Sequence, residues 1–135
     1  MELKSYQKVV LNDLYRFLAL LTEKQNIKRA YNAFWEEKGV PVGEMGIPPY
    51  NMILQGVPHV CFKVPTGGGK TFLAASSIKP IFDSMPHIHP IAVVWLVPSD
   101  AILNQTVATL QNAEHPYRRR INADFTGNVE VYTKG

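Results

Sequence analysis

Lys70 and Thr71 are the residues of this chain best suited to chemistry, because they directly follow three consecutive glycines. Glycines have no Cβ, so their backbone N–H groups can curve around an anion without steric conflict. A lysine ammonium after such a loop reaches terminal phosphates, and a threonine hydroxyl binds the Mg²⁺ that accompanies them. The pattern therefore predicts a nucleoside triphosphate site with an accompanying Mg²⁺.

The segments around this loop are those that a phosphate-binding loop requires. An apolar run at residues 59–64 predicts a strand, and residues 72–79 are compatible with a helix whose N-terminus adds positive potential. The structural alternative is a flexible glycine turn that binds nothing. The residues expected to bind nucleotide are Pro65, Thr66, Gly67, Gly68, Gly69, Lys70 and Thr71, and the last two are also assigned to catalysis.

The sequence Pro65-Thr66-Gly67-Gly68-Gly69-Lys70-Thr71 resembles motif I of superfamily 2 helicases of the DEAD/DEAH class. In that class the first glycine of the usual phosphate-loop pattern is often replaced, as it is here by Val64. Residues 58–75 resemble the amino-terminal helicase segment of type III restriction enzyme R subunits. The resemblance implies an α/β P-loop NTPase (RecA-like) fold, in which helices flank a parallel sheet.

The same resemblance divides the chain into two expected domains. Residues 1–57 are expected to form N-terminal helices and a Pro/Gly-rich loop, and residues 58–135 a partial, incomplete first motor domain. Apolar residues spaced by three or four predict an amphipathic helix over residues 3–21, and a second helical pattern covers residues 25–38. In related helicases a Tyr-Gln pair such as Tyr6-Gln7 places the glutamine against adenine. Gln7 is therefore a candidate for base recognition, or else a solvated polar residue on a helix surface.

A continuous apolar run at residues 91–97 predicts a strand buried on both faces. Ser99 then caps a helix that has Asp100 in its first turn. The piece from 94 to 106 resembles helicase motif Ia, which grips the nucleic-acid backbone. The residues with hydroxyl or amide groups suited to that contact are Ser99, Asn104, Gln105 and Thr106.

The run Arg118-Arg119-Arg120 is the only concentrated positive charge, and it is either a nucleic-acid contact or a solvated surface. Alternating residues at 129–133 predict a third strand. No strand is followed by the acidic pair that would hold a second Mg²⁺ contact and orient water for phosphoryl transfer. We therefore expect a fragment of a longer motor that is inactive alone.

Three functions follow from these patterns. The first is the ATP-binding part of a translocase that couples ATP hydrolysis to movement on DNA. The second is a nucleotide-binding or interaction fragment without catalysis, and the third is another phosphate-loop enzyme such as a kinase. For the first, the expected partners are double-stranded DNA, the second motor domain and a modification (methyltransferase) subunit.

Bulk properties limit the setting of the protein. The 135 residues carry a net charge of +3, which permits a polyanionic partner without indicating a strongly basic nucleic-acid surface. The single cysteine, Cys61, excludes an internal disulfide and suits a reducing compartment. No apolar run is long enough to span a membrane. The expected location is the cytoplasm.

Overall fold

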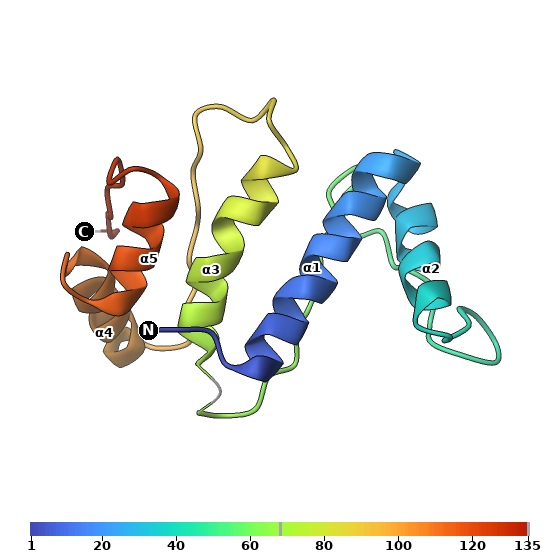
Figure 1. Cartoon of the computed structure of the whole chain (residues 1–135), viewed down its shortest axis with the longest axis horizontal. Coiled ribbons are helices and arrows are strands. Elements are labelled where there is room, and N and C mark those ends of the chain that lie inside the picture. Colours follow the sequence, from blue (N-terminus) through green and yellow to red (C-terminus); the bar gives the residue numbers. More distant parts are fainter. Residues whose placement is uncertain (68, 135) are drawn as a thin grey trace. The chain divides into compact units, whose positions relative to one another are not determined.

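The structure, a computed structural model, describes residues 1–67 and 69–134, and Gly68 and Gly135 lie outside the described residues. The described residues form five helices, which are labelled in Figure 1: α1 (Ser5–Lys24), α2 (Ile27–Glu37), α3 (Lys70–Asp83), α4 (Asp100–Gln111) and α5 (Pro116–Asp124). The chain divides into two compact units. One unit is Lys4–Pro65, and the other is Thr66–Gly135 together with Met1–Leu3.

The unit Lys4–Pro65 is built on the packing of α1 against α2. Phe17 and Leu20 of α1 are buried with Ala30 of α2, and the Phe17 ring meets the Phe34 ring edge-to-face at 6.2 Å. The helix predicted for residues 3–21 is confirmed, and Leu14 and Phe17 of its apolar stripe are buried, whereas Tyr6 is exposed. Asn26 begins α2 by accepting a hydrogen bond from the Arg29 N–H at 2.9 Å.

Two ion pairs tie the exposed edges of α1 and α2 together. The Arg16 Nε donates to a Glu37 carboxylate oxygen at 2.8 Å, and a second guanidinium nitrogen of Arg16 contacts the other oxygen. Lys38 pairs with Asp13. These side chains are partly exposed, so each pair contributes modestly to stability, and the bidentate Arg16–Glu37 pair has the better geometry.

The Arg16–Glu37 pair predicts a pH dependence. The hydrogen bond from Arg16 lowers the pKa of Glu37 below its ordinary value. A lowered carboxyl pKa contributes stability above the unfolded-state pKa, and that contribution is lost as pH falls through the folded-state pKa. We expect the NMR titration midpoint of the Glu37 carboxyl to rise toward its ordinary value in Arg16→Leu. An unchanged midpoint would show that the pair does not form in solution.

Aromatic side chains hold the Pro/Gly-rich loop that follows α2. The Tyr31 hydroxyl donates to the Pro48 carbonyl at 2.7 Å, and its ring lies 5.4 Å from that of Tyr50. The Tyr50 hydroxyl in turn accepts from the His59 backbone N–H at 3.0 Å. These contacts within the unit hold the loop from α2 to residue 59 in place.

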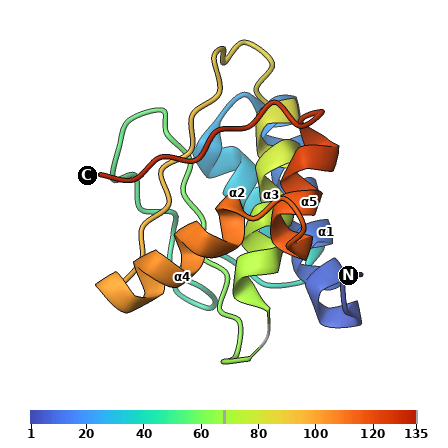
Figure 2. The same ribbon diagram turned by 90° about the vertical axis from the view of Figure 1, so that its left-hand side faces the viewer.

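In the second unit, α5 packs against both α3 and α4 (Figure 2). The centre of this packing is a cluster of one buried residue from each helix, Ala75, Leu110 and Ile121. Residues of the segments between and after the helices pack against the same cluster, among them Trp95, Val129 and Val131. Helix α3 continues through Pro80 to Asp83, beyond the helix expected at residues 72–79.

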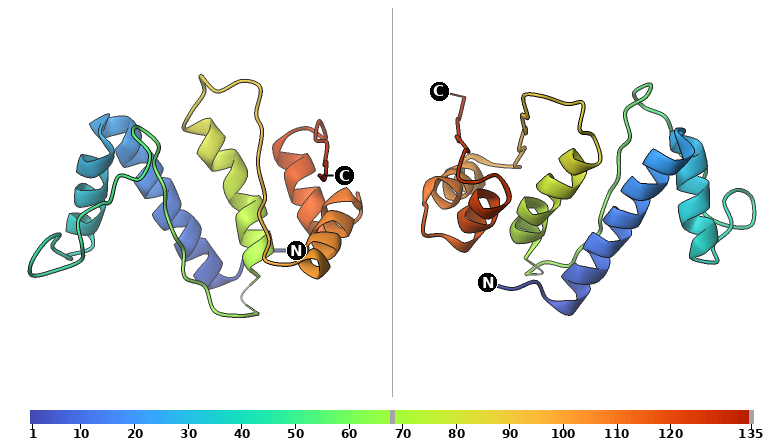
Figure 3. Two further views of the ribbon diagram at one scale, coloured as in Figure 1. Left: turned by 180° about the vertical axis from the view of Figure 1, so that it is seen from behind. Right: turned by 45° about the horizontal axis from the view of Figure 1, so that its top comes forward.

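The predicted parallel sheet is wrong for this structure. Residues 59–64, 91–97 and 129–133 are drawn without strand arrows in Figure 3, and within the described ranges the only pairing is an isolated bridge between Val42 and Ile47. The segment expected to be buried on both faces packs by Trp95 alone against the helix cluster. Val94 and Leu96 are 84% and 87% exposed. The runs at 91–97 and 129–133 therefore pack on the helix cluster through a few side chains without pairing as strands, and Val60 and Phe62 of the first run are exposed.

Ser76 of α3 gives a stability prediction. Its side chain is fully buried, and its hydroxyl has no hydrogen-bond partner among the described residues. An unsatisfied buried hydroxyl is costly, so Ser76→Ala is expected to raise the free energy of unfolding by about 1 kcal/mol in urea titrations. Ser77→Ala is the matched control, because the Ser77 hydroxyl donates to the Ala74 carbonyl at 2.7 Å. A loss of stability in Ser76→Ala would contradict the prediction.

No helix within the described ranges is both long enough and apolar enough to cross a membrane.

Candidate functional site

The backbone around Gly67 and Gly69 turns the chain into α3. Gly67 has φ 76° and Gly69 has φ 71° with ψ 41°, so both adopt the left-handed conformation that glycine adopts without strain. Helix α3 begins at Lys70, and the Gly69 carbonyl accepts its first backbone bond from the Leu73 N–H at 3.0 Å. The loop thus delivers Lys70 and Thr71 into the first turn of a helix, where free N–H groups and the helix dipole favour an anion.

The side chains of this loop are open to solvent. Pro65, Thr66 and Lys70 are exposed, and Thr71 is half-buried. No ion pair involves Lys70 among residues 1–67 and 69–134. Gly68, which the sequence also predicts to bind nucleotide, lies outside the described residues. An exposed cation without a carboxylate partner, at a helix N-terminus, can bind a phosphate at little desolvation cost.

Gln7 lies in the first turn of α1 and belongs to the other unit. Its side chain is buried, and its Oε1 accepts a hydrogen bond from the Lys4 backbone N–H at 2.8 Å. This bond is one half of a capping box, in which the third helical residue bonds back to the residue before the helix. Gln7 is therefore not a solvated polar residue, which corrects that alternative.

The four residues predicted to contact a nucleic-acid backbone lie at or within the first turns of α4. The Ser99 hydroxyl accepts a hydrogen bond from the Ile102 N–H at 3.3 Å, so the predicted N-cap is confirmed. Asn104 and Gln105 are exposed, and Thr106 is half-buried. Donors and acceptors are thus accessible on this helix, with Asp100 in its first turn.

A family model described as "Type III restriction enzyme, res subunit" matches residues 1–133. The chain belongs to this family. Membership places this Res-family chain in general terms among helicase-like ATPases, which use ATP with Mg²⁺ and act on nucleic acid. No curated protein and no solved structure gives a match.

The arginine run of the Res-family chain is occupied within the protein. Arg119 pairs with Glu114 at 2.5 Å and Arg120 with Asp124 at 3.2 Å. Arg118 is half-buried and donates hydrogen bonds to the Leu110 and Val129 carbonyls. The sequence pattern indicates no structural role for Arg118, although Pro116 at the start of α5 is a local helix signal.

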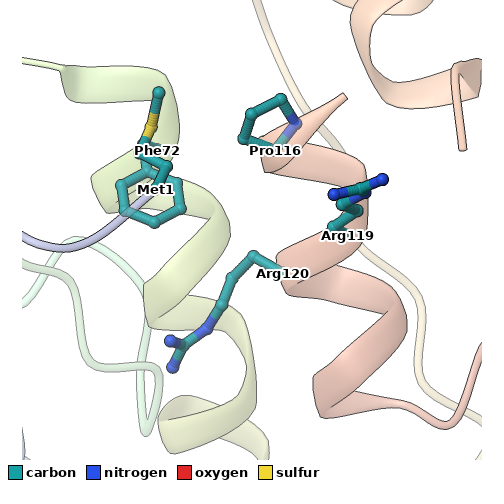
Figure 4. A pocket seen from close by; sticks show the side chains of 5 residues that line it. All are labelled: Met1, Phe72, Pro116, Arg119 and Arg120. Carbon is teal, nitrogen blue, oxygen red and sulfur yellow. The ribbon is translucent and has the colours of Figure 1, made fainter. Parts of the chain in front are cut away.

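A hollow of about 210 Å³ lies between α3 and α5 (Figure 4). Its lining consists of Met1, Phe72, Pro116, Arg119 and Arg120. Because both guanidinium groups have carboxylate partners, their charge is largely compensated there, which disfavours an anion in this hollow.

The described part of this Res-family chain holds no cluster of three or more His, Cys, Asp or Glu side chains that could bind a metal ion. Mg²⁺ is commonly bound through one or two protein ligands together with substrate phosphates and water. Thr71, half-exposed beside Lys70, fits the part of such a single ligand.

Gly67 gives the prediction for the loop backbone. A Cβ built on Gly67 meets nothing within 4 Å, so Gly67→Ala tests the left-handed conformation alone. That conformation costs an L-residue about 1–2 kcal/mol, and the shifted loop should weaken ATP binding about tenfold in a fluorescence displacement assay. Gly56→Ala is the matched control, since Gly56 has φ 73° with nothing within 4 Å but lies in the loop after α2. Equal loss of affinity in both variants would contradict a role for the loop.

Proposed function

We propose that this Res-family chain is the ATP-binding part of a DNA-dependent ATPase that couples ATP hydrolysis to movement along duplex DNA. One observation carries the proposal: two left-handed glycines lead into a helix whose first residue is the exposed Lys70. The family match over residues 1–133 supports the helicase-type setting. A glycine turn without a ligand would need neither the lysine nor the helix start.

In the proposed site each residue has a defined part. Lys70 neutralises the terminal phosphates, and the Thr71 hydroxyl holds the Mg²⁺ that bridges them. Backbone N–H groups of the glycine loop surround the phosphates, with Pro65 and Thr66 leading into it. Gln7 is the proposed contact to the adenine edge, because an amide can both donate and accept. Its Oε1 would exchange the hydrogen bond from the Lys4 N–H for one from the base.

The proposed track is the DNA backbone, contacted through α4. A hydroxyl or amide that bonds phosphate oxygen positions a protein on nucleic acid without reading sequence. The four proposed contacts are Ser99, Asn104, Gln105 and Thr106. The proposed protein partners are a second motor domain and a modification subunit, both of type III restriction systems.

The test has two parts. The 135-residue chain is titrated with a fluorescent ATP analogue, which is then displaced by ATP with Mg²⁺ or by AMP. We expect ATP to displace the analogue far better than AMP, because AMP lacks the β- and γ-phosphates that Lys70 would contact. The ATPase activity of a longer protein containing this chain is then measured with duplex DNA, single-stranded DNA and RNA.

Stimulation by duplex DNA would support the proposed motor. ATP binding without turnover in the longer protein would favour a nucleotide-binding module that lacks catalysis. Turnover that no nucleic acid stimulates would favour another class of phosphate-loop enzyme. Absence of ATP binding to a folded chain would refute the proposal.

A further inference from the structure

Phe72 connects the proposed nucleotide site to α5. Phe72 follows Thr71 directly in the first turn of α3, and only 3% of its surface is exposed. Its ring stacks on that of Tyr117 in α5, with centroids 5.7 Å apart and planes 25° from parallel. The turn that carries Lys70 and Thr71 is therefore held from behind by an aromatic contact.

Tyr117 is itself fixed at the start of α5. The His115 ring lies 4.6 Å from the Tyr117 ring, and His115 Nδ1 accepts the Tyr117 backbone N–H at 3.2 Å, which caps the helix. The next residue, Arg118, bonds to the Leu110 and Val129 carbonyls. Tyr117 thus presents its ring to Phe72 from a helix end with two independent anchors.

The stack with Tyr117 and the burial of Leu73 both restrict the rotation of the first turn of α3, and thereby the direction of Lys70. Successive residues of an α-helix are separated by about 100° around its axis, so fixing Phe72 also fixes where Lys70 and Thr71 project. Rotation of the first turn would redirect both side chains together with the free N–H groups that favour phosphate. Among the described residues of this unit, the first turn of α3 forms one contact between aromatic rings, and that is the stack of Phe72 on Tyr117.

We propose that Tyr117 is a positioning residue for the phosphate end of the bound nucleotide, acting through Phe72. This inference rests on the proposed function, because it concerns the same loop. The aromatic contact sets the rotation of the first turn of α3 and thereby the placement of Lys70 and Thr71. Removing this contact is therefore expected to weaken binding of ATP but not of adenosine, independently of any loss of fold stability.

The experiment measures the affinities for ATP with Mg²⁺ and for adenosine by displacement of a fluorescent ATP analogue. The proteins are the wild-type chain, Tyr117→Leu, Tyr117→Phe and Leu110→Ala, each at a temperature where circular dichroism shows it folded. Leu110→Ala is the stability control, because Leu110 is buried in the same cluster but lies on α4. Phe72→Leu removes the stack from its other side and decides the question if Tyr117→Leu does not fold.

We expect Tyr117→Leu and Phe72→Leu to bind ATP about fivefold more weakly with adenosine affinity unchanged, a loss within the range of one aromatic pair. Tyr117→Phe keeps the ring and should bind ATP as the wild type does. Leu110→Ala should lose stability and keep its ATP affinity. Wild-type ATP affinity in both stack variants, or equal weakening in Leu110→Ala, would overturn the positioning role. If the wild-type chain itself does not bind ATP, the proposed function fails and the positioning role with it.

Discussion

Lys70→Ala is expected to weaken ATP binding by this chain by about 10- to 100-fold. A charge-assisted hydrogen bond to a phosphate is worth about 1.5–3 kcal/mol, and the variant removes the ammonium without touching the loop backbone. Lys70 is exposed and has no ion-pair partner among the described residues, so its removal leaves no buried carboxylate behind. Displacement of a fluorescent ATP analogue measures the change.

Lys79→Ala is the matched control for charge. Lys79 lies on the same helix, and its ammonium pairs with Asp83 at 2.9 Å. A change of less than about twofold is expected there, because an exposed ion pair contributes little. A comparable loss of ATP affinity in both variants would indicate that binding depends on the net charge of the protein rather than on the loop, and would count against the site.

Arg118→Ala is expected to lower the free energy of unfolding by about 3 kcal/mol. The guanidinium donates to the Leu110 carbonyl at 2.8 Å, to the Val129 carbonyl at 2.7 Å and to Asn122 Oδ1 at 2.8 Å. It therefore joins the end of α4, the middle of α5 and the segment after α5. Hydrogen bonds from a charged donor are worth more than neutral ones, and the side chain is half-buried, so we discount their sum for solvent. Urea unfolding followed by circular dichroism measures the loss.

Arg119→Ala provides the comparison, because Arg119 is the next residue on the same helix. Its side chain is 64% exposed and its charged partner is Glu114. The change there should stay within about 0.5 kcal/mol, as for other surface substitutions. An equal loss of stability in the two variants would show that the hydrogen bonds from Arg118 to the Leu110 and Val129 carbonyls do not stabilise the packing of the segment after α5.

Local patterns in the sequence were sufficient for most of the helices. The apolar spacing of residues 3–21 corresponds to α1, and Ser99 caps α4 as predicted. Both signals act within a few residues of one another, so no distant contact is needed to interpret them. Helix α5 was missed because three consecutive arginines were interpreted only as a nucleic-acid contact or a solvated surface, whereas Arg118 donates hydrogen bonds within the protein.

Local patterns could not decide whether the apolar runs pair into a sheet. An apolar run indicates an extended, partly buried segment, but a sheet also requires a partner strand that is distant in sequence. In this structure Trp95, Val129 and Val131 pack against helices, and Val94 and Leu96 remain exposed. The hydrophobic pattern was therefore informative about burial on one face and misleading about backbone pairing.

The glycine loop and its helix could be identified from the sequence because they are contiguous. Gly67, Gly69 and Lys70 lie within four positions, and glycine with a positive φ is a local property. The assignment of these residues to ATP remains a prediction, as do the roles of Gln7 and of the α4 side chains. The stack of Phe72 on Tyr117 joins positions far apart in sequence, and only the structure reveals it.

The most direct test of the central claim is an NMR titration of the folded, ¹⁵N-labelled chain with ATP and Mg²⁺. We predict that the largest saturable shifts belong to the backbone amides of Gly67, Gly69, Lys70 and Thr71, and that in Lys70→Ala they saturate only at about 10- to 100-fold higher ATP concentrations. Shifts that saturate only at other helices, or no saturable shift in a folded chain, would contradict a phosphate site at the start of α3.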